Sequence, residues 1–266
     1  MMHEYRSRGI AFGAIVWLAV CLAGAGAMAA AAGKTPPVVP GDSALYRDCM
    51  ARVSKSPKLA FEQALAWHTT GGGFPARHCA ASALQALGQH AEAAARLQKM
   101  ALDMKAAPLA LRAKILQQAA GSWLRVKQRK RAIAALGNAI RMAPGNMALR
   151  SDRGLILALS GRLLEAVDDF NTVVEAEPKN ADVLVLRAAS YRRLKSIALA
   201  HDDLKRALAI DADHPDALLE RGILRLAGKD RAGARADWIR ILQVAPNSAA
   251  AAVARAKLAK LDLKAK

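Results

Sequence analysis

After residue 42, no stretch of the chain alternates apolar and polar residues in the way that a half-buried strand does. Apolar residues make up 53% of the chain, but only 4% of the residues are aromatic, and alanine supplies much of the apolar content. Sequence of this kind favours helices that pack closely against one another. We therefore predict an all-α fold, with enough residues for one large domain or one repeat array.

A period of 34 residues runs through this pattern. Pro144 and Pro178 are one period apart, and Pro246 lies two periods further on, with Ala212 between them. Small residues of a first helix predict a close crossing with a second helix, where a large apolar residue fills the space beside the contact. Four more columns keep the period: Ala120, Gly154, Ala188 and Gly222; Ala132, Ala166, Ala200 and Ala234; Leu136, Phe170, Leu204 and Trp238; and Ala139, Val173, Ala207 and Ile241.

These columns resemble the tetratricopeptide repeat (TPR) in residue type, order and spacing over about residues 113–247. The resemblance implies a TPR-type α-solenoid, in which antiparallel helix hairpins stack side by side. It places repeats at residues 113–146, 147–180, 181–214 and 215–247.

The pattern continues more weakly at both ends of these repeats. Residues 74–107 are similar to another, divergent repeat, with about five extra residues before the next one. Residues 43–73 are expected to form a degenerate first hairpin that ends in three glycines. Residues 248–264 are expected to form a capping helix, because the last repeat of a solenoid has no neighbour to cover it. Its predicted apolar face contains Val253, Leu258 and Leu261.

One column departs from the family pattern in a way that suggests ion pairs. Arginine replaces the expected leucine beside the small residue in three repeats, and an aspartate follows each arginine by 16 residues. We predict structural pairs between the two helices of each hairpin, and a row of arginines along a binding groove is the alternative. The pairs are Arg153 with Asp169, Arg187 with Asp203, and Arg221 with Asp237; in the remaining repeat both positions are alanine, Ala119 and Ala135.

Arg192 and Arg193 are the candidate groove residues. They lie late on a first helix, and the family resemblance implies that first helices line the concave side of the solenoid.

The amino terminus has the three parts of a secretory signal. Arg6 and Arg8 precede an apolar stretch, and Ala27-Met28-Ala29 fits a cleavage site. We predict a signal peptide at residues 1–29, with an N-terminal membrane anchor as the alternative, and a Pro-rich linker at residues 30–42. The expected location is periplasmic or secreted, and less favourably the inner membrane.

The mature chain would contain two cysteines, Cys49 and Cys79. An even number of cysteines in an exported protein favours a disulfide, and the resemblance implies that adjacent first helices touch. The alternative is two buried thiols. The sequence around both cysteines is also similar to the amino-terminal part of exported TPR proteins of alphaproteobacteria. His78, beside Cys79, is interpreted as a surface histidine and not as a metal ligand.

The charge and the motifs bear on function. The formal net charge of +18 favours an anionic partner, but no basic block with interleaved aromatic residues supports nucleic acid. No metal-ligand spacing, cofactor motif or catalytic motif is present, so we expect no cofactor, no metal site and no enzymatic activity. The predicted function is a monomeric scaffold or adaptor that binds a protein or peptide in the bacterial cell envelope. The alternative is a basic solenoid that binds an anionic polymer, a membrane surface or another anionic envelope component.

Overall fold

The computed structural model describes residues 44–263, which are helical and contain no strand, so the predicted all-α class is confirmed. The predicted signal peptide (1–29) and linker (30–42) lie outside the described residues. The chain divides between Ala143 and Pro144 into two compact units, and each is described by itself.

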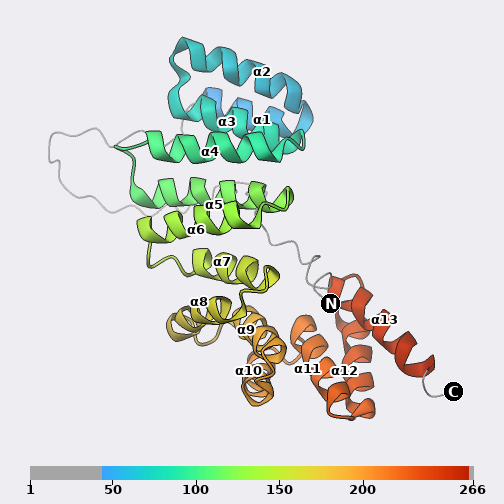
Figure 1. The fold of residues 1–266 in the computed structure, drawn as a ribbon. Helices are drawn as coiled ribbons and strands as arrows, with labels where there is room; N and C mark the ends of the chain where they lie inside the picture. The colour runs from blue at the N-terminus through green and yellow to red at the C-terminus, as the bar shows by residue number, and fades with distance from the viewer. Residues whose placement is uncertain (1–43, 264–266) are drawn as a thin grey trace, which may run out of the picture. The chain divides into compact units, whose positions relative to one another are not determined.

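The first unit consists of three consecutive antiparallel hairpins (Figure 1). A π-helical turn, η2 (His68–Gly72), joins the first hairpin to the second. Four of the extra residues expected before the third hairpin lie in its first helix, because that helix begins at Leu109. The helices are α1 (Ala44–Lys55), α2 (Pro57–Trp67), α3 (Gly73–Ala86), α4 (His90–Asp103), α5 (Leu109–Arg125) and α6 (Arg129–Met142).

The second unit consists of three further hairpins and a last helix that packs on α11 and α12 (Figure 1). Small side chains dominate the packed face of this last helix: Ala250, Ala251 and Ala254 are buried, whereas Val253 and Leu258 are only partly covered. The helices are α7 (Met147–Leu159), α8 (Leu163–Ala176), α9 (Ala181–Arg193), α10 (Ile197–Ile210), α11 (Pro215–Ala227), α12 (Arg231–Val244) and α13 (Ala249–Leu263).

Close helix crossings hold each of these hairpins together. A Cβ atom added at Gly154 would lie 2.6 Å from the Phe170 ring, and one added at Gly222 would lie 2.4 Å from Trp238 Nε1. Phe170 and Trp238 are both fully buried. Glycine therefore faces an aromatic ring in two hairpins, whereas in the α5–α6 and α9–α10 hairpins the same columns hold alanine and leucine. The two columns change together because their combined volume must fit one crossing.

The turn inside each of these hairpins places one residue in the left-handed region. Gly88 and Gly161 take this conformation, but lysines take it at the equivalent positions of the other turns, with φ of 60° to 67°. Gly228, expected from the sequence to mark such a turn, lies one residue before the left-handed position and has φ of −80°. These lysines are Lys127, Lys195 and Lys229.

A disulfide joins α1 to α3. The sulfur atoms of Cys49 and Cys79 are 1.98 Å apart and the two Cα atoms are 6.2 Å apart. Both cysteines are buried, in a cluster with Ala64 and Ala80. The bond therefore fastens the first helix of one hairpin to the first helix of the next.

Reduction of this disulfide with an excess of a dithiol is expected to lower the local free energy of unfolding by about 3–4 kcal/mol, because the unfolded chain regains the freedom of a loop closed across 30 residues. Hydrogen exchange in α1 and α3, followed by mass spectrometry, measures the change. The Cys49→Ala/Cys79→Ala variant is the control and should not respond to the dithiol. Unchanged protection in the reduced wild type would contradict the prediction.

The Gly222–Trp238 crossing makes a second prediction. Gly222→Ala should destabilise the protein by about 1–3 kcal/mol, because the new methyl group collides with the buried ring. Trp238→Leu should destabilise it by leaving a cavity. The double variant recreates the alanine–leucine pair of the α9–α10 hairpin, so a urea-unfolding cycle should show favourable coupling of about 0.5–3 kcal/mol. Additive losses would show that the two columns do not depend on each other.

Candidate functional site

In the second unit, the first helices of the hairpins form one continuous row. Helix α9 packs directly on both α7 and α11, and α11 packs on α13, whereas α8 and α10 pack mainly against first helices. Because the first helices approach one another most directly, they form the inner side of the row. We call the exposed surface of α7, α9 and α11 the inner face.

Arg192 and Arg193, the predicted groove residues, both reach across this inner face. Arg192 donates from Nε to Glu220 Oε2 (2.6 Å) and from Nη2 to Glu220 Oε1 (3.2 Å). Glu220 is buried, so this pair fixes α9 to α11 through an enclosed carboxylate. Arg193 donates from Nη1 to the carbonyl oxygen of Ala158 (2.7 Å), which fixes α9 to α7. Burial, followed by the charge of Arg192, lowers the pKa of Arg193.

His214 makes a further connection between α9 and α11. It caps α11 by accepting the backbone N–H of Ala217 at Nδ1 (3.4 Å), so its Nε2 carries the proton. That nitrogen lies 3.1 Å from Oδ1 of Asp182, at the start of α9. The inner face is therefore held by side-chain contacts between neighbouring first helices, which keep its shape defined.

The predicted arginine–aspartate residues meet in pairs. Each arginine donates from Nε and Nη2 to the two carboxylate oxygens of its aspartate, at distances of 2.6 to 3.0 Å. The three aspartate side chains are 3–4% exposed. The pairs are Arg153 with Asp169, Arg187 with Asp203, and Arg221 with Asp237. The arginines thus reach to the second helix of their own hairpin, which favours the structural role over the groove.

A second arginine approaches each of these buried carboxylates. Arg225 lies 2.8 Å from Asp237, whereas Arg150 and Arg206 are more distant, at 3.5 and 3.6 Å from their aspartates. Hydrogen bonding to the aspartates is the main cause that raises the pKa of Arg153 and Arg187. In the α5–α6 hairpin the same positions hold Ala119 and Ala135, both fully buried. The repeat pattern did not predict these additional arginines, because they are not on the 34-residue period.

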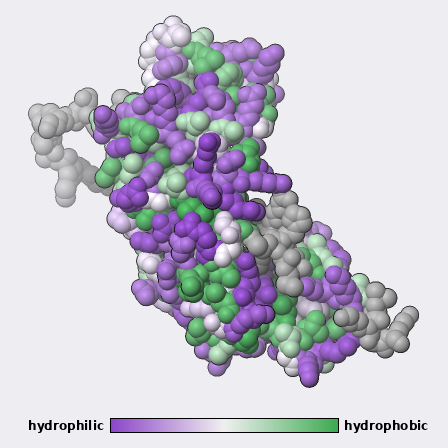
Figure 2. Space-filling view, viewed as in Figure 1, coloured by the Kyte–Doolittle hydropathy of each residue, from purple (hydrophilic) through white to green (hydrophobic). Residues whose placement is uncertain are grey.

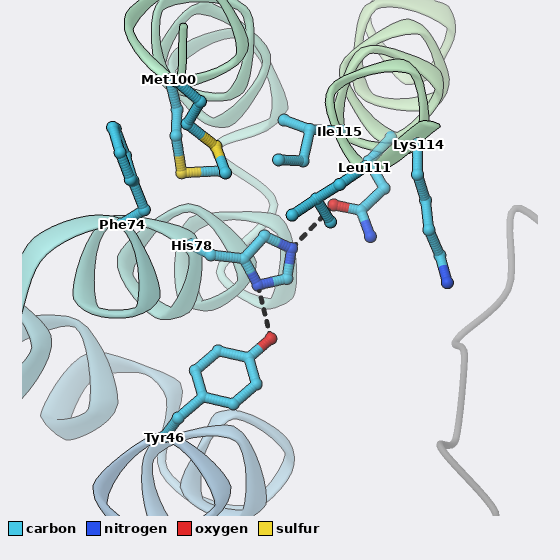
Figure 3. Close-up of a pocket in the computed structure, with 9 residues that line it drawn as sticks. Tyr46, Phe74, His78, Met100, Leu111, Lys114 and Ile115 are labelled. Atoms are coloured by element: carbon cyan, nitrogen blue, oxygen red, sulfur yellow. Dashed lines mark hydrogen bonds between the residues drawn. The ribbon is translucent and has the colours of Figure 1, made fainter. Parts of the chain in front are cut away.

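The first unit has a small pocket beside the disulfide (Figure 3). His78 lies half-buried in it, and both ring nitrogens are hydrogen-bonded: Nδ1 to the Tyr46 hydroxyl and Nε2 to Gln118 Oε1, each at 2.8 Å. Because the amide oxygen only accepts, Nε2 carries the proton and Tyr46 donates to Nδ1. Burial is the main cause that lowers the pKa of His78, and it raises the pKa of Tyr46 to about 12.

This pocket is not the exposed environment predicted for His78. Its volume is about 40 Å³, room for a few water molecules only. Phe74, Met100 and Ile115 supply apolar walls. The three hydrogen-bonded side chains come from α1, α3 and α5, so the pocket joins three first helices through a neutral histidine.

Two further properties of residues 44–263 bear on function. No three histidine, cysteine, aspartate or glutamate side chains in this range are grouped so that they could bind a metal ion. None of the helices in the same range combines the length and the apolar character needed to cross a membrane.

Comparison with known proteins identifies the repeat. The family model for the tetratricopeptide repeat matches residues 119–190. Two solved structures share the fold: Pseudomonas aeruginosa pilF, with a TM-score of 0.58 and 15% identity over 80% of this chain and 96% of that one, and YrrB, with a TM-score of 0.53 and 17% identity over 74% and 97%. The predicted TPR-type solenoid is therefore confirmed.

The curated relatives match in sequence over a shorter range. RNA polymerase II-associated protein 3 of Xenopus laevis is 35% identical over 89 residues, which cover 34% of this chain and 14% of that protein. The protein of the same name from Homo sapiens is 33% identical over 88 residues, 33% of this chain and 13% of that protein. The match thus spans about one seventh of the length of these relatives.

These relatives correct the location predicted from the amino terminus. They are named for association with RNA polymerase II and come from animals, whose transcription takes place inside the cell. The predicted periplasmic or secreted location is therefore wrong, and so is its inner-membrane alternative. The family prediction does not depend on the location, because it follows from the repeat columns. Its five columns, the stacked hairpins and the match at residues 119–190 agree, and the chain belongs to the tetratricopeptide-repeat family.

Proposed function

We propose that this protein is a non-catalytic scaffold that binds a segment of a partner protein along the inner face of α7, α9 and α11. The observation that carries the proposal is the row of first helices, held by Arg192 with Glu220 and by Arg193 with Ala158. A surface held in one shape before binding loses little conformational freedom when a partner docks. This favours recognition of a peptide or a helix over catalysis.

The chemistry of the inner face also supports binding. Leu155 lies one helical turn before Ala158 and is half-buried, so an apolar side chain lies beside the arginine contacts of α9. An apolar contact next to fixed polar groups is the usual composition of a protein-binding surface. YrrB, which shares the fold, is described as a TPR protein with an unusual peptide-binding site, and this is consistent with such a role.

The experiment places a photo-crosslinking amino acid, benzoylphenylalanine, at Leu155 on the inner face or at Leu164 on the outer helix α8. Leu164 is the matched control, because it is also a leucine of the same hairpin and is 69% exposed. We expect covalent adducts with a partner protein at Leu155 and not at Leu164, measured by mass spectrometry after irradiation of cells. Circular dichroism checks that both variants are folded.

Adducts at Leu164 alone, or at equal yield from both positions, would contradict binding along the inner face. The Leu164 variant controls for exposure, because it is the more accessible of the two and would collect chance contacts first.

A further inference from the structure

The positive charge of this protein is concentrated in one hairpin. No acidic residue occurs between Asp103 and Asp152, and the α5–α6 hairpin contains eight basic residues. Residues 44–143 contain 16 basic and 4 acidic side chains, a net charge of +12, whereas residues 144–263 contain 19 and 16, a net charge of +3. The basic residues of the hairpin are Arg112, Lys114, Arg125, Lys127, Arg129, Lys130, Arg131 and Arg141.

Five of these residues form one exposed cluster at the turn between α5 and α6, which we call the basic turn (Arg125, Lys127, Arg129, Lys130 and Arg131). Among the described residues, none of the five forms an ion pair with a carboxylate. Exposed arginines of the second unit do find such partners: Arg162 pairs with Glu165, and Arg240 with Asp213. Hydrophilic residues dominate the visible surface over α5 and α6 (Figure 2).

Folding alone does not explain the basic turn. Three of its cations lie in the first turn of α6, at the positive end of the helix dipole, where acidic residues are favourable. The equivalent helices α4 and α8 have Glu92 and Glu165 there. Lys127 occupies the left-handed position that glycine takes in two other hairpins. The cluster is therefore maintained against the local preferences of the backbone.

We propose that the basic turn binds an acidic segment of a partner protein, one rich in aspartate and glutamate. This inference rests on the proposed function as a scaffold for protein partners, but it uses a different surface from the inner face. Five exposed cations within seven residues match a run of carboxylates along an extended chain.

The surroundings of the cluster favour a protein segment over nucleic acid or membrane. Trp123 is the aromatic residue of the hairpin, but it is 4% exposed and Arg131 covers its ring at 4.6 Å, so it offers no surface for stacking a base. Leu109 is the exposed large apolar residue of the hairpin, and it lies at the opposite end of α5, about 25 Å from the turn. The basic turn thus has charge but no apolar anchor for a bilayer.

The test uses a fluorescein-labelled peptide of alternating aspartate and glutamate, twelve residues long, in anisotropy titrations with the full chain. Arg129→Glu/Lys130→Glu should weaken binding by at least about tenfold, because it reverses two of the five charges. It should not lower the melting temperature, because glutamate is favourable at the start of a helix. Lys127→Gly removes one charge at a position where glycine fits, and should weaken binding by a smaller factor.

The matched control is Lys179→Glu/Lys205→Glu, which makes the same change in net charge at two exposed lysines of the second unit. It should change the affinity by less than about twofold at an ionic strength of about 0.15 M, where distant charges are screened. Equal weakening by the control and by Arg129→Glu/Lys130→Glu would overturn the proposal, because binding would then depend on net charge alone.

Two competing ligands complete the experiment: a twelve-nucleotide oligothymidine and vesicles that contain phosphatidylserine. Tighter binding of either one than of the acidic peptide, lost in Arg129→Glu/Lys130→Glu, would assign the basic turn to nucleic acid or membrane and overturn the proposal. Crosslinking from Leu155 tests the inner face separately, so one of the two surfaces can fail while the other stands.

Discussion

The crossing of two helices at a small residue is the contact on which the rest of this structure depends. Where glycine allows the helices to approach, an aromatic ring fills the space beside it; where alanine separates them by a methyl group, leucine is large enough. This exchange of volume keeps the hairpin geometry similar while the residues change. Similar hairpins can stack in a row, and the row creates the inner face that Arg192 and Arg193 cross.

The arginine–aspartate pairs add a second layer to this contact. Burying a carboxylate is unfavourable unless its charge is matched and its oxygens are hydrogen-bonded, and the bidentate pairs do both. The α5–α6 hairpin closes with Ala119 and Ala135 in the same places, so the ion pair is not required for closure. Its replacement by alanine removes an acidic residue from this hairpin and contributes to the unbalanced charge at the basic turn.

The fold could be predicted from the sequence because close packing leaves a periodic record of small and large residues. The hairpins, the facing of Arg153 and Asp169, and the meeting of Cys49 and Cys79 all follow from one period of 34 residues. Contacts off that period could not be predicted: Glu220 opposite Arg192, Gln118 opposite His78, and the left-handed Lys229 beside Gly228 depend on how neighbouring helices lie in space. The location was predicted wrongly, since an apolar amino-terminal pattern does not by itself identify a compartment.

The two units differ in how they use charge, and this difference shapes what each surface can recognise. In residues 144–263 most arginines are paired with the chain's own carboxylates and carbonyl groups, so the inner face presents fixed contacts whose strength depends little on salt. In the α5–α6 hairpin the cations face solvent, where attraction acts over about 8 Å at physiological ionic strength and fades as salt rises. Fixed contacts favour selectivity for the shape of a partner, whereas exposed charge favours rapid capture of an oppositely charged one. The uneven distribution of acidic residues along the chain is thus what separates these two kinds of surface.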